Sequence, residues 1–373
     1  MAEAGEVHIT VATGWVEGRT SLDVAHETTL VKAALLYADR VTLASPRVAL
    51  LASFASILAV GEVERADVAL QMVQVMPEGR DIAARVRSLR RKKHKTVDER
   101  YRLLKMEQQL RATGAELAKK VEELLTGAGV AELAAAMGAG VVDLDALGMG
   151  EAGAIDNVAH RLGDVLAKVV SPGSTTYPLL DESTNSLVRA MVREGMIPGG
   201  PVATTAEPAL AASWIGDMEA FPGAPIEAVL DARAALRNPL VRFRAAVLQV
   251  SRDLEATPLD EEWQRTAEEA YREHVAPALL ELRQLAEEQK VLSLLRHATS
   301  ADALKKVGAA GLGLFGATTA DVPAIVGAAV GVAAEVGSAM VGRYQELADR
   351  SRANAFLFLY EADRELARRA PLG

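Results

Sequence analysis

The 373-residue chain contains no cysteine, and this absence removes several classes of protein at once. Without thiols there is no disulfide, no thiolate zinc site, no iron–sulfur cluster and no cysteine nucleophile. Disulfides are typical of secreted proteins, so a chain without cysteine fits the cytoplasm. The residues MAEAGEVHITVATG also lack the basic segment and apolar run of a secretory signal. We therefore expect a cytoplasmic location.

Aromatic residues make up only 4% of the chain, although 50% of its residues are hydrophobic. β-Sandwiches and barrels favour aromatic and β-branched side chains, whereas helix packing does not require them. The composition therefore predicts a mostly α protein of the α+β class. The net charge of −9 argues against binding of nucleic acid by the whole surface, so nucleic acid is not an expected partner.

Long apolar runs are missing from the one stretch that comes closest to a membrane segment, residues 305–344. This stretch is rich in Gly and Ala, and Asp321 and Glu335 interrupt it. A membrane-spanning helix needs roughly 20 apolar residues. A carboxylate near the centre of such a helix costs a few kcal/mol. Uninterrupted membrane-spanning helices are therefore not expected here.

The same stretch has the pattern of a helical hairpin. Asp321 can cap the second helix of this hairpin, and Gly327 and Gly331 form a G-x-x-x-G pair that lets another helix approach closely. In architecture alone, an apolar hairpin with basic ends resembles the central hairpin of pore-forming colicins. Two interpretations follow: a buried hairpin in a helical bundle, or a hairpin that inserts into or attaches to a membrane after a trigger.

Near the N-terminus the pattern indicates a small α/β element. Glu6–Gly14 alternates as a strand does, Asp23–Ala38 has helical spacing, and Arg40–Ala44 is a second short strand. A right-handed crossover would make these strands parallel. We interpret Val141–Leu144 as a further short strand and Ser171–Pro178 as a loop.

The domain organisation follows from changes in composition. We predict a small α/β element over 1–79, a helical region with a long basic helix over 80–198 and a linker over 199–225. The C-terminal helical domain then covers 226–373 and contains the apolar hairpin 305–344. The proposed linker holds two Pro-rich stretches, which are typical of connections.

Basic residues are concentrated in Arg80–Lys105, which holds eleven of them against three acidic residues. Its centre has the sequence RRKKHK. Such a segment can bind an acidic protein surface, anionic lipid or, as the least favoured of the three, nucleic acid. The residues that we predict to make this contact are Arg90, Arg91, Lys92, Lys93 and Lys95.

A Gly-rich loop over 148–153 matches the spacing G-x-G-x-x-G between a predicted strand and a predicted helix. In dinucleotide-binding proteins such a loop places backbone amides against a pyrophosphate. Asp145 and Glu151 would oppose a phosphate here. The six histidines are dispersed, and no spacing typical of metal ligands occurs. We therefore expect no cofactor and no metal, and no catalytic residue can be assigned.

These features favour a non-enzymatic, cytoplasmic, helical interaction protein that contacts a protein partner, with anionic contacts through its basic helix. A membrane-inserting, toxin-like or defence-type effector that uses the hairpin 305–344 is the first alternative, and it implies an anionic membrane as partner. A nucleotide-binding enzyme that uses the loop 148–153 is the second. No pattern bears on the oligomeric state.

Overall fold

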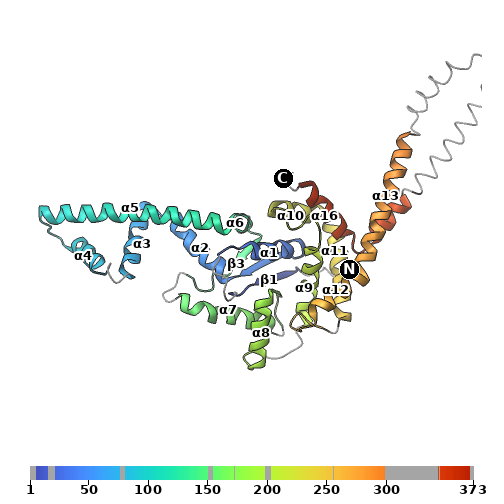
Figure 1. Cartoon of the computed structure of the whole chain (residues 1–373), viewed down its shortest axis with the longest axis horizontal. Coiled ribbons are helices and arrows are strands. Elements are labelled where there is room, and N and C mark those ends of the chain that lie inside the picture. Colours follow the sequence, from blue (N-terminus) through green and yellow to red (C-terminus); the bar gives the residue numbers. More distant parts are fainter. Residues whose placement is uncertain are drawn as a thin grey trace, which may run out of the picture. The chain divides into compact units, whose positions relative to one another are not determined.

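The computed structural model describes residues 6–15, 22–75, 80–149, 154–171, 173–197, 203–254, 256–298, 343 and 345–369. The chain is mostly helical and has a small parallel sheet near its N-terminus, as its composition predicts (Figure 1). It forms two compact units. Unit 1 comprises Met1–Ala212, Pro225–Leu230 and Thr257–Leu259, and unit 2 comprises Ser213–Ala224, Asp231–Ala256 and Asp260–Gly373.

The sheet of unit 1 grows from the predicted βαβ unit. Strand β1(His8–Ala12), helix α1(Ala25–Tyr37) and strand β2(Arg40–Ala44) follow one another, and the two strands are parallel. Strand β3(Val142–Leu144) pairs with β2, which confirms the third predicted strand. Strand β4(Tyr177–Leu180) pairs with the other side of β1. The four strands have the order β3-β2-β1-β4 and are all parallel.

Strand β4 corrects the prediction of a loop over Ser171–Pro178, which was wrong for its last two residues. Proline lacks a backbone N–H and is confined to edge strands, so Pro178 argued against a strand. Pro178 lies opposite Thr10, and β4 is an edge strand in which one row of amide groups needs no partner.

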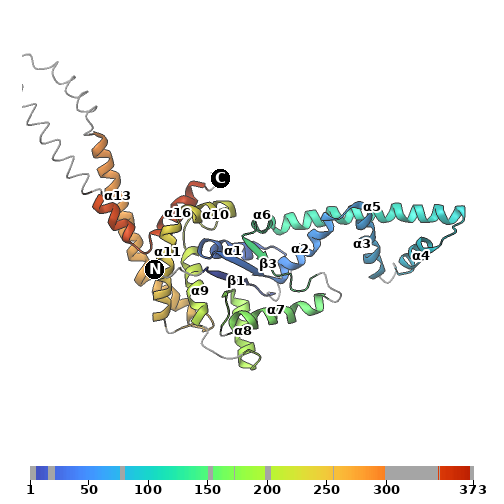
Figure 2. The same ribbon diagram turned by 180° about the vertical axis from the view of Figure 1, so that it is seen from behind.

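Helices cover both faces of the sheet (Figures 1 and 2). Helices α1 and α6(Ala131–Gly138) lie on one face, and α7(Ala154–Val170) lies on the other. Buried side chains of α7 pack with Ala12, Ala44 and Leu147 at the ends of the strands. Helix α8(Glu182–Arg193) follows β4 directly and contributes Val188 to this core.

Between β2 and α6 the chain forms α2(Pro46–Ala59) and then three helices that we call the α3–α5 bundle. These are α3(Glu62–Val75), α4(Arg80–Arg91) and α5(Val97–Ala128). The basic segment, predicted as part of a long basic helix, spans α4, the turn Lys92–Thr96 and the start of α5. Ala66, Leu70, Val86 and Leu110 belong to the core of the bundle. A Cβ atom on Gly114 would lie 3.1 Å from the carbonyl of Arg65, so this glycine permits the close approach of α3 and α5.

Unit 2 is built from helices alone in its described residues. The last residues of α9(Ala203–Gly216) and of α10(Ile226–Ala235) belong to it. Its other helices are α11(Arg237–Asp253), α12(Trp263–Ala270), the π-helix η2(Tyr271–Val275), α13(Ala276–Ala298), a helical segment over 345–353 and α16(Leu357–Arg369). Four aromatic rings form its centre: Trp214, Phe243, Phe356 and Phe358.

The domain boundaries inferred from composition remain predictions, but two observations bear on them. The interval 199–225, interpreted as a linker, contains the whole of α9. Strands β3 and β4 join the sheet from outside the interval 1–79. The Pro–Gly residues that suggested a linker precede α9, and the Ala-rich sequence after them has high helix propensity.

Within the residues that the structure describes, no helix combines the length and the apolar character needed to cross a membrane.

Candidate functional site

The predicted anion-binding residues lie where α4 ends and α5 begins. Arg90 and Arg91 are the last residues of α4, and Lys92–Thr96 connect it to α5. Thr96 caps α5: its hydroxyl accepts the Glu99 N–H, and the Glu99 carboxylate accepts the Thr96 N–H. This capping box fixes the direction in which the chain enters α5. We call Arg90–Lys95 the basic turn.

Three of the five predicted contact residues have partners inside the bundle. Arg90 forms ion pairs with Asp67 of α3, at 2.6 Å, and with Glu107 of α5, at 3.3 Å. These contacts raise the pKa of Arg90, chiefly through the hydrogen bond to Asp67. Lys92 pairs with Glu99 at 2.6 Å, and Lys95 donates to the carbonyl groups of Arg90 and Lys92. Within the described residues, only Arg91 and Lys93 of the five make no such contact.

Beyond the basic turn, the start of α5 exposes large apolar side chains. Val97, Tyr101 and Leu104 are 81%, 68% and 55% exposed. Residues spaced i, i+4 and i+7 lie on one face of a helix, so the three form a continuous row. We call this row the apolar stripe. The residues beside it that carry exposed positive charge are Arg100, Arg102 and Lys105.

The opposite end of α5 is fixed to the sheet layer. The carbonyl of Ala128 accepts the N–H of Val24, which directly precedes α1, at 3.0 Å. At about 1.5 Å per residue, the 32 residues of α5 span about 48 Å. The apolar stripe and the basic turn therefore lie at the far end of a long helix whose other end is anchored beside the sheet.

The remaining residues singled out in the sequence lie partly or wholly outside the described part of the chain. Gly327, Gly331, Asp321 and Glu335 all lie outside it, so the hairpin 305–344 stays a prediction. Of the loop 148–153 only its first two residues are described, after a turn in which Leu147 and Gly148 both have positive φ. The strand expected before this loop is β3, and the helix expected after it is α7.

A second polar cluster, which the sequence did not reveal, lies at the carboxyl ends of the strands. Thr13 follows β1, Ser45 follows β2, and Asp181 follows β4. The cluster also contains Glu27 of α1 and Arg47 of α2. Strands β2 and β4 flank β1. The chain therefore runs from β1 to its neighbour β2 on one side, and later returns to form β4 on the other side of β1. Open parallel sheets bind ligands at such a switch point.

Glu27 and Arg47 form a buried ion pair at this edge. Their exposed fractions are 0% and 3%, and Arg47 Nε lies 3.0 Å from Glu27 Oε1. The hydroxyls of Thr13 and Ser45 donate to the same carboxylate oxygen at 3.3 and 3.2 Å. Within the described residues, Glu27 Oε2 and Arg47 Nη2 make no hydrogen bond. A buried charged group that lacks hydrogen bonds is costly in free energy. A polar group of a ligand that supplied the missing hydrogen bonds would therefore be bound favourably at this cluster.

At the switch point itself, the start of α8 meets the end of β1. Asp181 caps α8 by accepting the Thr184 N–H at 2.7 Å. A Cβ atom on Gly14 would lie 3.1 Å from Ser183 Oγ, so β1 and α8 are in close contact here. His26 Nε2 lies 3.8 Å from Asp181 Oδ2. No group of three His, Asp or Glu side chains suited to a metal ion occurs among the described residues.

Comparisons of the chain with protein-family models, with curated proteins and with solved structures find no match. Function must therefore be argued from the arrangement of side chains.

Proposed function

We propose that the chain is a non-enzymatic interaction protein that binds a protein partner through the start of α5. The observation that carries this proposal is the apolar stripe of Val97, Tyr101 and Leu104, whose side chains are more than half exposed. A row of exposed apolar side chains on one helix face is typical of helices that pack against another protein.

Charge identifies the kind of partner. Arg100, Arg102 and Lys105 are exposed beside the stripe, and no ion pair is found for them among the described residues. Arg91 and Lys93 extend the positive charge into the basic turn. A partner surface with an apolar centre and acidic surroundings complements this arrangement. An acidic protein is therefore the proposed partner, and anionic lipid is the alternative that the experiment must separate.

The basic turn has a structural role in this proposal as well. Arg90 links α3, α4 and α5 through Asp67 and Glu107, so it holds the bundle together and is not itself assigned to the partner. We therefore assign the partner contact to the apolar stripe and to the exposed cations beside it, and no longer to all five residues predicted from the sequence. These cations are Arg91, Lys93, Arg100, Arg102 and Lys105.

A photo-crosslinking amino acid in place of Tyr101 tests the proposal in cells. We expect one protein adduct that disappears when Arg100 and Arg102 are both replaced by Glu. The same crosslinker in place of Val241, which is 56% exposed in unit 2, is the matched control and should give no such adduct. Binding of the purified partner should then weaken by about tenfold or more in Tyr101→Ala/Leu104→Ala, as expected for an aromatic contact residue.

Three results would contradict this function. The first is an adduct only with a second copy of the chain. The second is an adduct that survives the charge reversal. The third is recovery of the purified chain on vesicles of anionic lipid, with loss of recovery in Tyr101→Ala/Leu104→Ala, which would assign the stripe to a membrane surface.

The polar cluster at the carboxyl edge of the sheet favours a second candidate function, a nucleotide-binding enzyme. This proposal moves the ligand from the loop 148–153 to the switch point beside Gly14 and Asp181. A saturating nucleotide at 100 times its dissociation constant should stabilise the folded chain by about 2.7 kcal/mol. Thermal melting with ATP and with NAD measures this, and unchanged melting with both would remove the proposal.

A further inference from the structure

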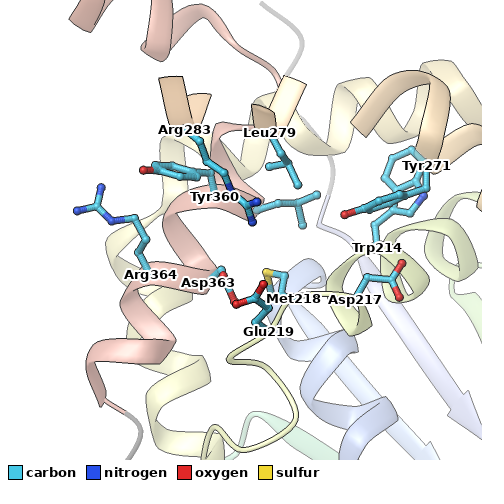
Figure 3. Close-up of a pocket in the computed structure, with 11 residues that line it drawn as sticks. Trp214, Asp217, Met218, Glu219, Tyr271, Leu279, Arg283, Tyr360, Asp363 and Arg364 are labelled. Atoms are coloured by element: carbon cyan, nitrogen blue, oxygen red, sulfur yellow. The ribbon is translucent and has the colours of Figure 1, made fainter. Parts of the chain in front are cut away.

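Unit 2 contains a cavity of about 420 Å³ that neither proposed function uses (Figure 3). Its wall is formed by the end of α9 and the turn after it, by η2, α13 and α16. The side chains that line it are Trp214, Asp217, Met218, Glu219, Tyr271, Leu279, Arg283, Leu359, Tyr360, Asp363 and Arg364. A cavity of this volume suits a small molecule.

An irregular turn of helix supplies one wall of the cavity. Tyr271 begins the π-helix η2, in which the N–H of Ala276 donates to the Tyr271 carbonyl five residues back. Pro277 follows at once; it has no N–H, and its ring would clash with the carbonyl four residues earlier in a regular α-helix. The wider turn relieves this clash and offsets the face of α12 from that of α13.

Apolar side chains form part of the cavity lining. Trp214 and Leu359 are each 1% exposed, and Met218 is also buried. The Trp214 ring belongs to the aromatic core and lies edge-on to Phe356, with 5.8 Å between ring centroids. The aromatic core of unit 2 positions this apolar part of the lining, against which a hydrocarbon group can pack.

Carboxylates dominate one side of the cavity. Figure 3 shows Asp217, Glu219 and Asp363 along this side, with Leu279 and Arg283 on the opposite side. Asp363 accepts the N–H of Ala220 at 2.8 Å. Among the described residues, Asp217 and Glu219 form no ion pair. The guanidinium group of Arg364 lies over the ring of Tyr360, with its central carbon 5.5 Å from the ring centroid.

Two ionisable groups of the cavity lining have raised pKa values. Burial raises the pKa of Asp217, and the nearby Glu268 carboxylate raises it further. Burial likewise raises the pKa of Tyr271, with Asp217 and Asp363 adding to the effect and Arg283 opposing it. Burial, the main cause of both shifts, disfavours charge of either sign, whereas the contributions of Glu268, Asp217 and Asp363 favour a positive charge over a negative one.

We propose that this cavity binds a small organic cation, namely a primary ammonium group on a hydrocarbon body. The ammonium group lies between Asp217, Glu219 and the Tyr271 hydroxyl, where carboxylates accept its hydrogen bonds. The hydrocarbon body lies against Trp214, Met218 and Leu359. The Trp214 and Tyr271 rings also attract a cation through their π faces. The three carboxylates disfavour an anionic ligand on their side of the cavity.

Calorimetric titration of the full chain with 2-phenylethylammonium tests this site, and 2-phenylethanol is the neutral probe of the same shape. We expect saturable binding of the amine and binding of the alcohol that is weaker by about tenfold, the ratio for the loss of one charge-assisted contact. Asp217→Asn should weaken amine binding by a similar factor and leave alcohol binding unchanged. Glu281→Gln is the matched control, since Glu281 is exposed on α13 between Leu279 and Arg283 and does not line the cavity.

Several outcomes would overturn the proposal. Equal affinity for amine and alcohol would show that charge is not recognised. Equal amine affinity in the wild type and in Asp217→Asn would place the cation elsewhere, as would an equal loss in Glu281→Gln. Absence of saturable binding of the amine up to about 10 mM would also reject the site, because weaker binding is not specific. If Asp217→Asn does not fold, Tyr271→Phe and Glu219→Gln replace it with the same expected selectivity for the amine.

Discussion

Unit 1 places ionic groups in two opposite environments. At the carboxyl edge of the sheet, Glu27 and Arg47 are buried and share hydroxyl donors from Thr13 and Ser45. In the α3–α5 bundle, Arg90, Asp67 and Glu107 are partly exposed to solvent. A buried charge that loses its partner keeps its desolvation cost, whereas an exposed charge is solvated again by water. The edge of the sheet should therefore tolerate little change, and the surface of the bundle should tolerate much.

The largest expected effect comes from Arg47→Met, which leaves the Glu27 carboxylate buried without its cation. We expect a loss of about 3–5 kcal/mol in the free energy of unfolding, measured by urea denaturation. The double variant Glu27→Gln/Arg47→Met should recover most of this loss, because it also removes the buried charge. A loss below about 1 kcal/mol in Arg47→Met, as for an exposed pair, would contradict the comparison.

A steric effect comes next, at the crossing of α3 and α5. A Cβ atom at Gly114 meets the Arg65 carbonyl, whereas one at Gly127 on the same helix meets no atom within 4 Å. Gly114→Ala should therefore lower the free energy of unfolding by about 1–3 kcal/mol relative to Gly127→Ala. Gly127→Ala should itself stabilise the chain by up to about 1 kcal/mol through helix propensity. Equal effects of the two substitutions would mean that α3 and α5 do not approach closely.

The exposed ion pairs of the bundle should contribute less. Arg90→Met removes the contacts to both Asp67 and Glu107, and we expect a loss of about 0.2–1 kcal/mol for each pair. High salt should reduce the difference between Arg90→Met and the wild type, since these side chains are reached by counterions. A loss as large as that of Arg47→Met would show that burial is not what separates the two environments.

The smallest expected effect concerns the acid sensitivity of the basic turn. The hydrogen bond from Lys92 and that from the Thr96 N–H lower the pKa of Glu99 below its ordinary value. The ionised carboxylate therefore stabilises the start of α5 above the ordinary glutamate pKa, and this contribution is lost as the pH falls through the lowered pKa. Hydrogen exchange at the Glu99 and Arg100 amides should accelerate over that acid range, after correction for the intrinsic rate. The variant Glu99→Gln should lack this transition, and an unchanged transition would assign it to another group.

Local patterns in the sequence were sufficient to predict the β1–α1–β2 unit and strand β3. Strand β4 was missed because Pro178 argues against a strand unless its place at the edge is known. Helix α9 was missed because Pro–Gly residues precede it. In both cases position in the fold outweighed local composition.

The candidate site was only partly visible. The basic segment was apparent from composition, but the stripe of Val97, Tyr101 and Leu104 was not recognised among the surrounding charges. Glu27, Arg47 and Asp181 are far apart in the sequence and are brought together only by the order of the strands. The cavity of unit 2 likewise depends on helices distant in the sequence. No local pattern encodes such clusters, because tertiary packing creates them.

The pairing of Ala12 with Leu180 has a consequence for synthesis on the ribosome. Strand β1 is synthesised before β2, but its second neighbour, β4, emerges only after β2, the α3–α5 bundle, β3 and α7. At roughly 5–20 residues per second, this delay is on the order of ten to thirty seconds. During that time one edge of β1 has open amide and carbonyl groups, which a chaperone or a second nascent chain can occupy.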